Sequence, residues 1–214
     1  MQNLKEVKEA FEEIAKVFTE SRQEPWKEIL TLIEHSQGPV LDAGCGCGAN
    51  AVYIAKISKQ NYVGLDITIN MLKKLRQIID VDTVAGDLTR LPFRDSSFRV
   101  VTCIATLHHV AAREERIRAI KEIVRVLKKG GQALITVWSR SVIKNLRDYI
   151  DKGEIVLIPW SWRLNKKIYR VYHLYTDKEL IEEVDEATHR IKIVVYGRYI
   201  RKRFENYITL LQKI

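Results

Sequence analysis

One short segment constrains the fold of this chain more than any other. Residues 40–48 read VLDAGCGCG, in which an apolar strand runs into an aspartate and then into glycines at alternating positions. Glycine lacks a Cβ, so such a turn adopts backbone angles that other residues avoid and lets a ligand approach the main chain. A helix is predicted from Ala49 to about Ser58, and its first amides suit the polar end of a ligand.

A second acidic residue follows this turn where a nucleoside site requires one. The predicted strand Tyr62–Asp66 comes next after the helix and ends in an acid. In sheets of this kind, an acid at that place accepts hydrogen bonds from ribose hydroxyls. The order of strand, glycine turn, helix, strand and acid therefore predicts a site for a cofactor that contains a nucleoside.

The spacing of the glycines separates the candidate cofactors. Dinucleotide enzymes carry G-x-G-x-x-G, whereas this chain has G-x-G-x-G, with Asp42 two residues before the first glycine. In this form the segment resembles motif I of the class I S-adenosylmethionine-dependent methyltransferases. An NAD enzyme and an α/β domain without a ligand are the alternatives.

Further segments resemble the same family in the same order. They are residues 84–88 after a third strand, 91–98 before the strand Val100–Ile104, and 123–131 before the strand Ala133–Val137. The resemblance implies that S-adenosylmethionine binds beside the glycine turn, with Asp66 on the ribose and Asp87 near the adenine amino group. It assigns the cofactor contacts to Asp42, Gly44, Cys45, Gly46, Gly48, Asp66, Ile67, Gly86, Asp87, Leu88, Ile104 and His108.

Strands and helices alternate between residues 40 and 137, which predicts an α/β fold with a mostly parallel sheet and helices on both faces. The resemblance implies a Rossmann-like methyltransferase fold with seven strands and an antiparallel closing strand. We expect a single domain over residues 1–214. Its parts are N-terminal helices (1–37), a cofactor-binding core (38–138), a substrate-side insertion (139–175), and a closing helix and strands (176–214).

Composition excludes several classes of protein. The 214 residues are 46% hydrophobic and 29% charged, which is typical of globular proteins. There is neither an apolar run of membrane-spanning length nor a signal-peptide core, so we expect a cytoplasmic protein without membrane contact. Three cysteines do not form a disulfide framework. Two of them lie in the glycine turn, where small residues allow close ligand approach, and we expect no metal.

The formal net charge of +9 favours a polyanionic partner such as RNA. A Lys/Glu-rich surface of the kind found in heat-adapted proteins is the alternative explanation. Basic residues are concentrated near the C-terminus, at Arg190, Lys192, Arg198, Arg201, Lys202 and Arg203.

Three regions carry a narrower resemblance. They are residues 11–22 with Pro25-Trp26, residues 105–110, and residues 158–160 followed by 170–175. Together they resemble the tRNA methyltransferases that esterify the carboxymethyl group of the modified wobble uridine. The resemblance covers nearly the full chain, up to residues 205–207. Cys47 and Tyr207 depart from it, since Asn or Thr and Trp are commoner there.

The implied reaction needs no general base, because a carboxylate with a pKa of about 4 is already ionised at neutral pH. The enzyme mainly has to hold and align the reacting groups. Arg22 and Arg170 are the candidates for binding the carboxylate, since a guanidinium forms paired hydrogen bonds with it. Trp138, Tyr172 and His109 are the candidates for contacting the uracil.

Each of these residues also has a structural interpretation. Arg22 is alternatively a solvated charge at a helix end, and Trp138 a core residue. One of His108 and His109 alternatively shapes the cavity wall, and the tyrosines of residues 170–175 alternatively pack the insertion down.

Two other functions remain open at this stage. One is methylation of a small molecule such as a quinone precursor or lipid, and the other is a non-catalytic module that binds a cofactor or RNA. The expected partners are the tRNA anticodon region and, from the resemblance, a small zinc-ribbon activator protein. The activator is expected at an unprotected edge strand near Val81–Ala85. A terminal helix that shields this strand is the alternative.

Overall fold

The computed structural model describes residues 4–21, 24–33, 38–57, 61–161, 164–202 and 204–214. Arg22, one of the two predicted carboxylate ligands, and Arg203 of the basic C-terminal region lie outside these residues.

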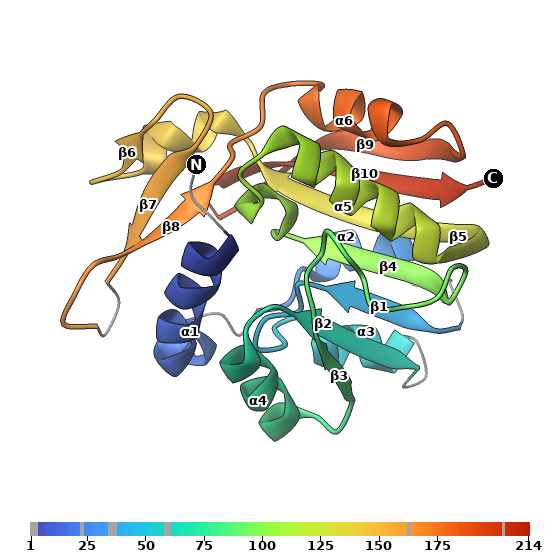
Figure 1. Cartoon of the computed structure of the whole chain (residues 1–214), viewed down its shortest axis with the longest axis horizontal. Helices are drawn as coiled ribbons and strands as arrows, with labels where there is room; N and C mark the ends of the chain where they lie inside the picture. The colour runs from blue at the N-terminus through green and yellow to red at the C-terminus, as the bar shows by residue number, and fades with distance from the viewer. Residues whose placement is uncertain (1–3, 22–23, 34–37, 58–60, 162–163, 203) are drawn as a thin grey trace.

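A seven-stranded sheet forms the centre of the molecule, with the strand order β3-β2-β1-β4-β5-β10-β9 (Figure 1). The strands are β1 (Val40–Ala43), β2 (Tyr62–Asp66), β3 (Asp82–Ala85), β4 (Phe98–Ile104), β5 (Leu127–Trp138), β9 (Ile191–Arg201) and β10 (Phe204–Lys213). Strands β1 to β5 pair in parallel, whereas β10 runs antiparallel to β5 and β9 antiparallel to β10. The predicted fold class is confirmed, and β3 does lie at the edge of the sheet.

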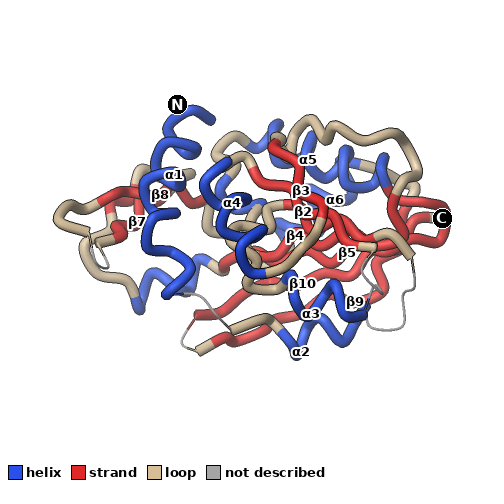
Figure 2. Tube along the Cα trace, turned by 90° about the horizontal axis from the view of Figure 1, so that it is seen from below, coloured by secondary structure: helices blue, strands red, loops and turns tan. Residues whose placement is uncertain are grey.

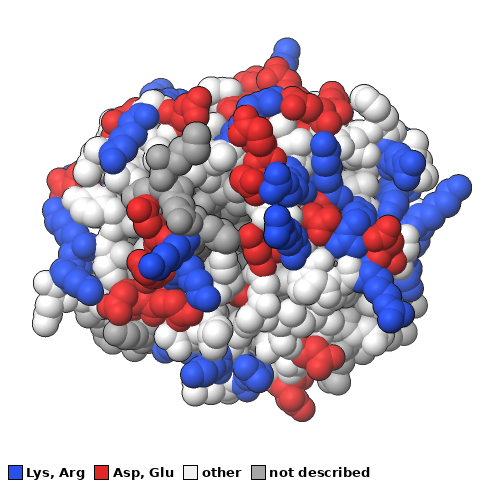
Figure 3. All heavy atoms as spheres, in the orientation of Figure 1, with Lys and Arg blue, Asp and Glu red and all other residues white. Residues whose placement is uncertain are grey.

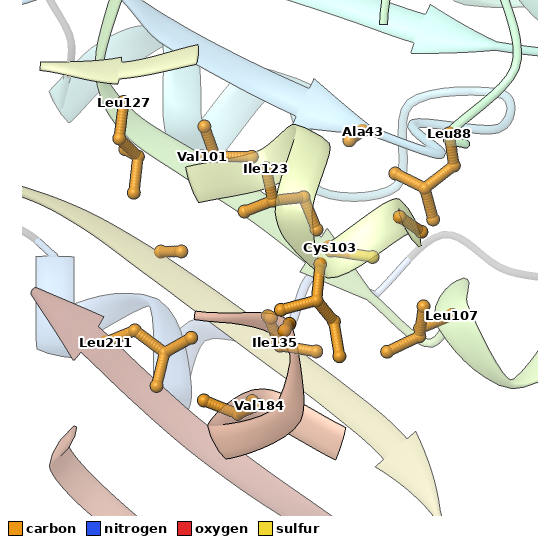
Figure 4. Packing of buried hydrophobic residues seen from close by; sticks show 14 of the residues in the cluster. Ala43, Leu88, Val101, Cys103, Leu107, Ile123, Leu127, Ile135, Val184 and Leu211 are labelled. Carbon is orange, nitrogen blue, oxygen red and sulfur yellow. The ribbon is translucent and has the colours of Figure 1, made fainter. Parts of the chain in front are cut away.

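Helices cover both faces of this sheet (Figure 2). One face carries α5 (Arg113–Val126) and α6 (Glu179–Ala187), and the other carries α2 (Lys27–Leu30), α3 (Ala51–Ile57) and α4 (Ile69–Ile78). In α5 the buried residues recur every three or four positions, as in Ile117, Ile120 and Ile123, so one stripe of the helix meets the sheet. Figure 4 shows Ile123 of α5 and Val184 of α6 packed with strand residues such as Val101 and Ile135.

Residues 176–179 have the sequence of a helix capping box, Thr-Asp-Lys-Glu. A capping box over residues 176–179 predicts a helix that begins there, but α6 begins at Glu179. Lys178 has a φ of 68°, so the chain enters the helix through a left-handed residue. Half of the box forms, because the Thr176 amide donates to the Glu179 carboxylate at 2.9 Å.

The predicted insertion forms a small antiparallel sheet beside the carboxyl ends of the central strands. After the 3-10 helix η3 (Arg140–Asn145), its strands are β6 (Ile150–Asp151), β7 (Val156–Trp160) and β8 (Ile168–Tyr172). The N-terminal helix α1 (Leu4–Ser21) packs against both α4 and β8 (Figure 1). Glu12 of α1 accepts hydrogen bonds from the amides of Ile69 and Asn70, at 2.9 and 3.2 Å, and so fixes α1 on the first turn of α4.

Candidate active site

A cavity of about 700 Å³ opens where the parallel strands end. Its wall takes residues from the carboxyl ends of β1 to β5 and from α1, β7, β8 and β10. Ligands of doubly wound sheets bind at this end because the loops that follow the strands converge there. The cavity therefore lies where sequence reasoning expects the cofactor.

The three glycines of the turn have different roles. Gly44, Gly46 and Gly48 have φ of 88°, 54° and 88°, which side chains rarely allow. A Cβ on Gly44 would lie 2.2 Å from the Thr106 side chain, and one on Gly48 would lie 2.4 Å from Leu75. A Cβ on Gly46 would meet nothing within 4 Å, and Gly46 lines the cavity. Gly46 is thus the glycine whose missing side chain leaves open space beside the backbone, where a ligand can approach.

Asp66 lines the cavity at the end of β2, and backbone amides hold both of its carboxylate oxygens. Gly46 donates to Oδ2 at 2.9 Å and Thr68 donates to Oδ1 at 2.8 Å. Burial raises the pKa of Asp66, while the amides of Thr68 and Gly46 oppose that shift. The acid is oriented before any ligand binds.

Asp87 lines the same cavity beyond β3. The amide and hydroxyl of Thr89 both donate to its carboxylate at 2.9 Å, which fixes the loop. Other predicted cofactor contacts that line the cavity are Gly44, Cys45, Ile67, Gly86, Leu88 and Ile104.

Asp42 and Gly48 do not line the cavity, so their predicted contacts with the cofactor stay predictions. Asp42 is buried at the end of β1, where it accepts hydrogen bonds from Tyr62 Oη at 3.0 Å and Thr102 Oγ1 at 2.8 Å. Burial raises the pKa of its carboxyl from 3.8 to about 6, and the two hydroxyl donors only partly offset this. These contacts tie the start of the glycine turn to β2 and β4.

Of the two adjacent histidines, only His109 lines the cavity, and its Nδ1 lies 2.8 Å from the carbonyl oxygen of Val171. His108 is only 1% exposed and accepts a hydrogen bond at Nδ1 from the amide of Trp138 at 3.1 Å. His108 therefore holds the end of β5, and its predicted contact with the cofactor stays a prediction.

Aromatic side chains form part of the cavity wall. Trp138 lines the cavity and stacks on Phe204, with ring centroids 5.0 Å apart. Tyr172 stacks on Trp138 at 4.8 Å, is fully buried and does not line the cavity. In this position Tyr172 supports Trp138, and its predicted contact with a substrate stays a prediction.

Arg170 is a buried cation in this wall. Only 5% of the residue is exposed, and its guanidinium carbon lies 4.8 Å from the Trp160 ring centroid and 5.1 Å from that of Tyr172. No carboxylate or carbonyl of the described residues pairs with it, and its Nε is buried without a hydrogen-bond partner. A buried guanidinium that makes no internal ion pair is suited to an anionic ligand.

Sequence reasoning missed several residues of the cavity. Phe11 of α1 lines it with its ring centroid 4.8 Å from that of His109, and Asn206 of β10 lines it beside Trp138. Periodicity marks Phe11 only as an apolar helix position, and nothing local in a closing strand marks Asn206 as part of a site.

The comparisons with known proteins agree with this geometry. Residues 41–135 match a family model described as a methyltransferase domain. The chain is 33% identical over 179 residues to an Encephalitozoon cuniculi protein named "Putative methyltransferase", covering 80% of this chain and 81% of that protein.

The chain belongs to the class I S-adenosylmethionine-dependent methyltransferases.

Two solved structures share the fold of this methyltransferase. An S-adenosylmethionine-dependent methyltransferase from Methanosarcina mazei matches 87% of this chain and 97% of its own, with a TM-score of 0.71 and 21% identity. A chain from the complex between the Haloferax volcanii Trm112 methyltransferase activator and a methyltransferase matches 97% of both chains, with a TM-score of 0.72 and 19% identity.

A relative from Arabidopsis thaliana carries a more specific name. It is the tRNA (carboxymethyluridine(34)-5-O)-methyltransferase, 34% identical over 137 residues, which is 63% of this chain and 33% of that protein. The methyltransferase thus spans about a third of this relative's length.

The cavity suits S-adenosylmethionine, which this methyltransferase uses. On the side of the sheet, the cavity has three polar features: the open backbone at Gly46, the oriented carboxylate of Asp66 and the Asp87 loop. These residues would hold the cofactor.

Away from the cavity, an ion-pair network fastens the insertion to α5 and α6 of the methyltransferase. His173, Glu179 and Glu183 lie close enough to share a metal ion, with ligand atoms within 4.8 Å of one another. Arg116 already pairs with Glu183 at 2.7 Å, and the Tyr175 hydroxyl donates to Glu183 at 2.9 Å. The network therefore neutralises the acids through Arg116. Among the described residues, no helix is both long and apolar enough to cross a membrane.

Proposed function

We propose that this methyltransferase converts the carboxymethyl group of the modified wobble uridine of tRNA into its methyl ester. The observation that supports this most strongly is Arg170, a buried guanidinium in the cavity wall that has no anionic partner among the described residues. Similarity to the Arabidopsis enzyme supports the same substrate.

The chemistry asks little of the protein beyond binding and alignment. When bound, S-adenosylmethionine supplies an electrophilic methyl group on a sulfonium sulfur that leaves as a neutral thioether. A substrate carboxylate is already ionised at neutral pH, so no side chain has to remove a proton. Arg170 binds the carboxylate through charge-assisted hydrogen bonds. Alignment of this kind contributes up to about 7–11 kcal/mol to catalysis.

The aromatic wall provides the contact for the uracil. Trp138 stacks on Phe204 and on Tyr172, so a base would pack against the part of its ring that lines the cavity. Aromatic side chains are common contacts of unstacked bases in single-stranded RNA. His109 lines the same cavity, and its position is fixed by the carbonyl of Val171. An RNA base turned out of the anticodon would contact Trp138 and His109 while its side group reaches Arg170.

The tRNA backbone would run past the mouth of the cavity, where Lys202 is exposed and pairs with Glu24 at 3.4 Å. Arg201 also lines the mouth, but its guanidinium donates to the carbonyls of Glu24 and Pro25, so it mainly fixes that segment. Arg198 lies elsewhere on β9, beside Asp177. Figure 3 shows that Lys and Arg are interspersed with Asp and Glu over one face, so the charges on that face do not mark an RNA-binding surface. We therefore assign RNA binding to the mouth of the cavity.

A small zinc-ribbon activator would bind at β3, with the zinc held by that partner. The strand pairs only with β2, its Asp82 and Ala85 are exposed, and Ile78 at the end of α4 is 47% exposed. Helix α1 packs on α4 and β8. The structural likeness to a methyltransferase from a Trm112 complex supports such a partner. We expect the complex to act in the cytoplasm.

The decisive experiment uses anticodon stem-loops that carry either 5-carboxymethyluridine or uridine at the wobble position. Each is incubated with cofactor and with the protein, expressed alone or together with an activator, and its nucleosides are analysed by mass spectrometry. One methyl group should appear, only on the carboxymethylated loop, and mild alkali should remove it as an ester would predict. Labelling of a quinone precursor or lipid instead of RNA would favour a small-molecule enzyme, and cofactor binding without any turnover would favour a non-catalytic module.

A further inference from the structure

Asn206 carries an unsatisfied acceptor in the wall of the cavity. It is fully buried on β10 and pairs across the ladder with Trp138 of β5, so the two side chains lie on the same face of the sheet. Both residues line the cavity. The side-chain oxygen of Asn206 is buried without a hydrogen-bond partner.

The backbone determines which way this amide points. Asn206 Nδ2 donates to the carbonyl oxygens of Phe204 and Tyr199, at 3.0 and 3.4 Å. Turning the amide over would place its oxygen against two other acceptors, so the observed orientation is the only one that these carbonyls favour. Because both amide hydrogens are directed at the backbone, only the side-chain oxygen remains for another partner, and it can only accept a hydrogen bond.

Such an acceptor destabilises the folded protein unless something donates a hydrogen bond to it. Buried groups of this kind require an explanation, and a ligand that donates a hydrogen bond is one. Trp138 lines the cavity beside Asn206, so an aromatic ligand at this place would contact its ring.

We propose that Oδ1 of Asn206 accepts a hydrogen bond from the N3–H of the target uracil, an inference that rests on the proposed function. Uracil in a nucleoside has one ring N–H, at N3. Its two carbonyl groups are acceptors, and Oδ1 has no hydrogen to donate to them. Cytosine has no hydrogen at N3, so the lone pairs would oppose one another. Asn206 is therefore a specificity-determining residue for a uracil protonated at N3.

The test compares three stem-loops that carry 5-carboxymethyluridine: the parent, its N3-methyl derivative, which lacks the donor, and its 2-thio derivative, which retains it. For the wild-type protein, kcat/KM should fall about 10- to 100-fold on N3-methylation, because the buried acceptor then has no donor. The 2-thio loop should stay within a few-fold of the parent, and this comparison needs no variant protein.

A double-mutant cycle then assigns the preference to Asn206. Asn206→Ala should lower kcat/KM on the parent loop by a similar factor and should process the parent and N3-methyl loops equally, because alanine has no side-chain acceptor. Cofactor affinity measured by calorimetry, together with the melting temperature, verifies that the variant folds. If it does not fold, the wild-type comparison with the three loops decides.

Three outcomes would overturn the inference. The first is a wild-type enzyme that methylates the parent and N3-methyl loops equally well, and the second is an equal loss on the 2-thio loop, which would indicate general crowding. The third is a folded Asn206→Ala variant that keeps the wild-type preference, as expected if a water fills the site. In all three cases the parent loop is still methylated and the proposed function stands, whereas no methylation of any loop would refute both.

Discussion

The amide of Gly46 donates a hydrogen bond to Oδ2 of Asp66 over 2.9 Å. This bond joins the turn after β1 to the end of β2, so the glycine turn and the acid behind it form one rigid unit. The second carboxylate oxygen accepts from Thr68 at the start of α4. Asp66 therefore both faces the cavity and fixes the loops on either side of it.

Asp66→Ala should weaken S-adenosylmethionine binding by about 1.5–3 kcal/mol, the range for hydrogen bonds to a charged group. Isothermal titration calorimetry on the purified protein measures this loss. Asp82→Ala, at an exposed acid on β3, is the matched control and should bind the cofactor as the wild type does. Equal affinities for the two variants would remove Asp66 from the cofactor site.

Arg170→Gln should lower turnover of the carboxymethylated stem-loop about 10- to 100-fold, since it removes a charge-assisted hydrogen bond of about 1.5–3 kcal/mol. Cofactor affinity should not change. Arg170→Lys should recover part of the rate, because it restores the charge but not the paired geometry. Arg118→Gln, on the exposed surface of α5, is the control. An Arg170→Gln enzyme with wild-type turnover would refute the carboxylate site.

Binding of tRNA should weaken as salt rises, because phosphate contacts release counterions. Lys202→Glu should reduce tRNA affinity and flatten the dependence of affinity on salt, without changing cofactor binding. Arg198→Glu makes the same change of charge on β9, at a residue that pairs with Asp177 and does not line the cavity, and should have less effect. Fluorescence anisotropy over a salt series measures both, and equal effects of the two variants would indicate a diffuse basic surface.

The β3 edge should bind an activator protein through backbone pairing and nearby apolar contacts. Ile78→Glu places a charge beside this edge and should prevent co-elution with a co-expressed activator in size-exclusion chromatography. Val194→Glu makes the same change at the opposite edge of the sheet, where Val194 is 44% exposed, and should leave the complex intact. A wild-type chain that is fully active alone and never co-elutes would rule the partner out.

Asp42→Asn should stabilise the protein at alkaline pH. The carboxyl has a pKa of about 6 in the folded protein, against an ordinary 3.8. The stability that its protonated form contributes is therefore fully present below pH 3.8 and is lost as pH rises through 6. An asparagine does not ionise. Relative to the wild type, the free energy of unfolding of the variant should therefore rise between these two pH values, by about 3 kcal/mol at most. Urea denaturation at pH 4 and pH 8 measures the difference. Asp82→Asn is the control, and a gain that does not vary with pH would contradict the prediction.

The sequence by itself determined the fold class and the cofactor half of the site. The glycine turn and the acids that end β2 and follow β3 are local features, because they depend on backbone angles within a few residues and on where a strand stops. Once a parallel sheet is inferred, these ends meet at one edge. Asp66 and Asp87 accordingly line the cavity that the strand order places there.

Only the tertiary structure decided which neighbouring side chains face that cavity. His108 and His109 are adjacent in sequence, yet one holds the backbone of β5 and the other lines the cavity. Asn206 reaches Trp138 only because β10 pairs with β5 in one register. Side-chain direction and strand register depend on packing between segments far apart in the chain, and no local pattern records them.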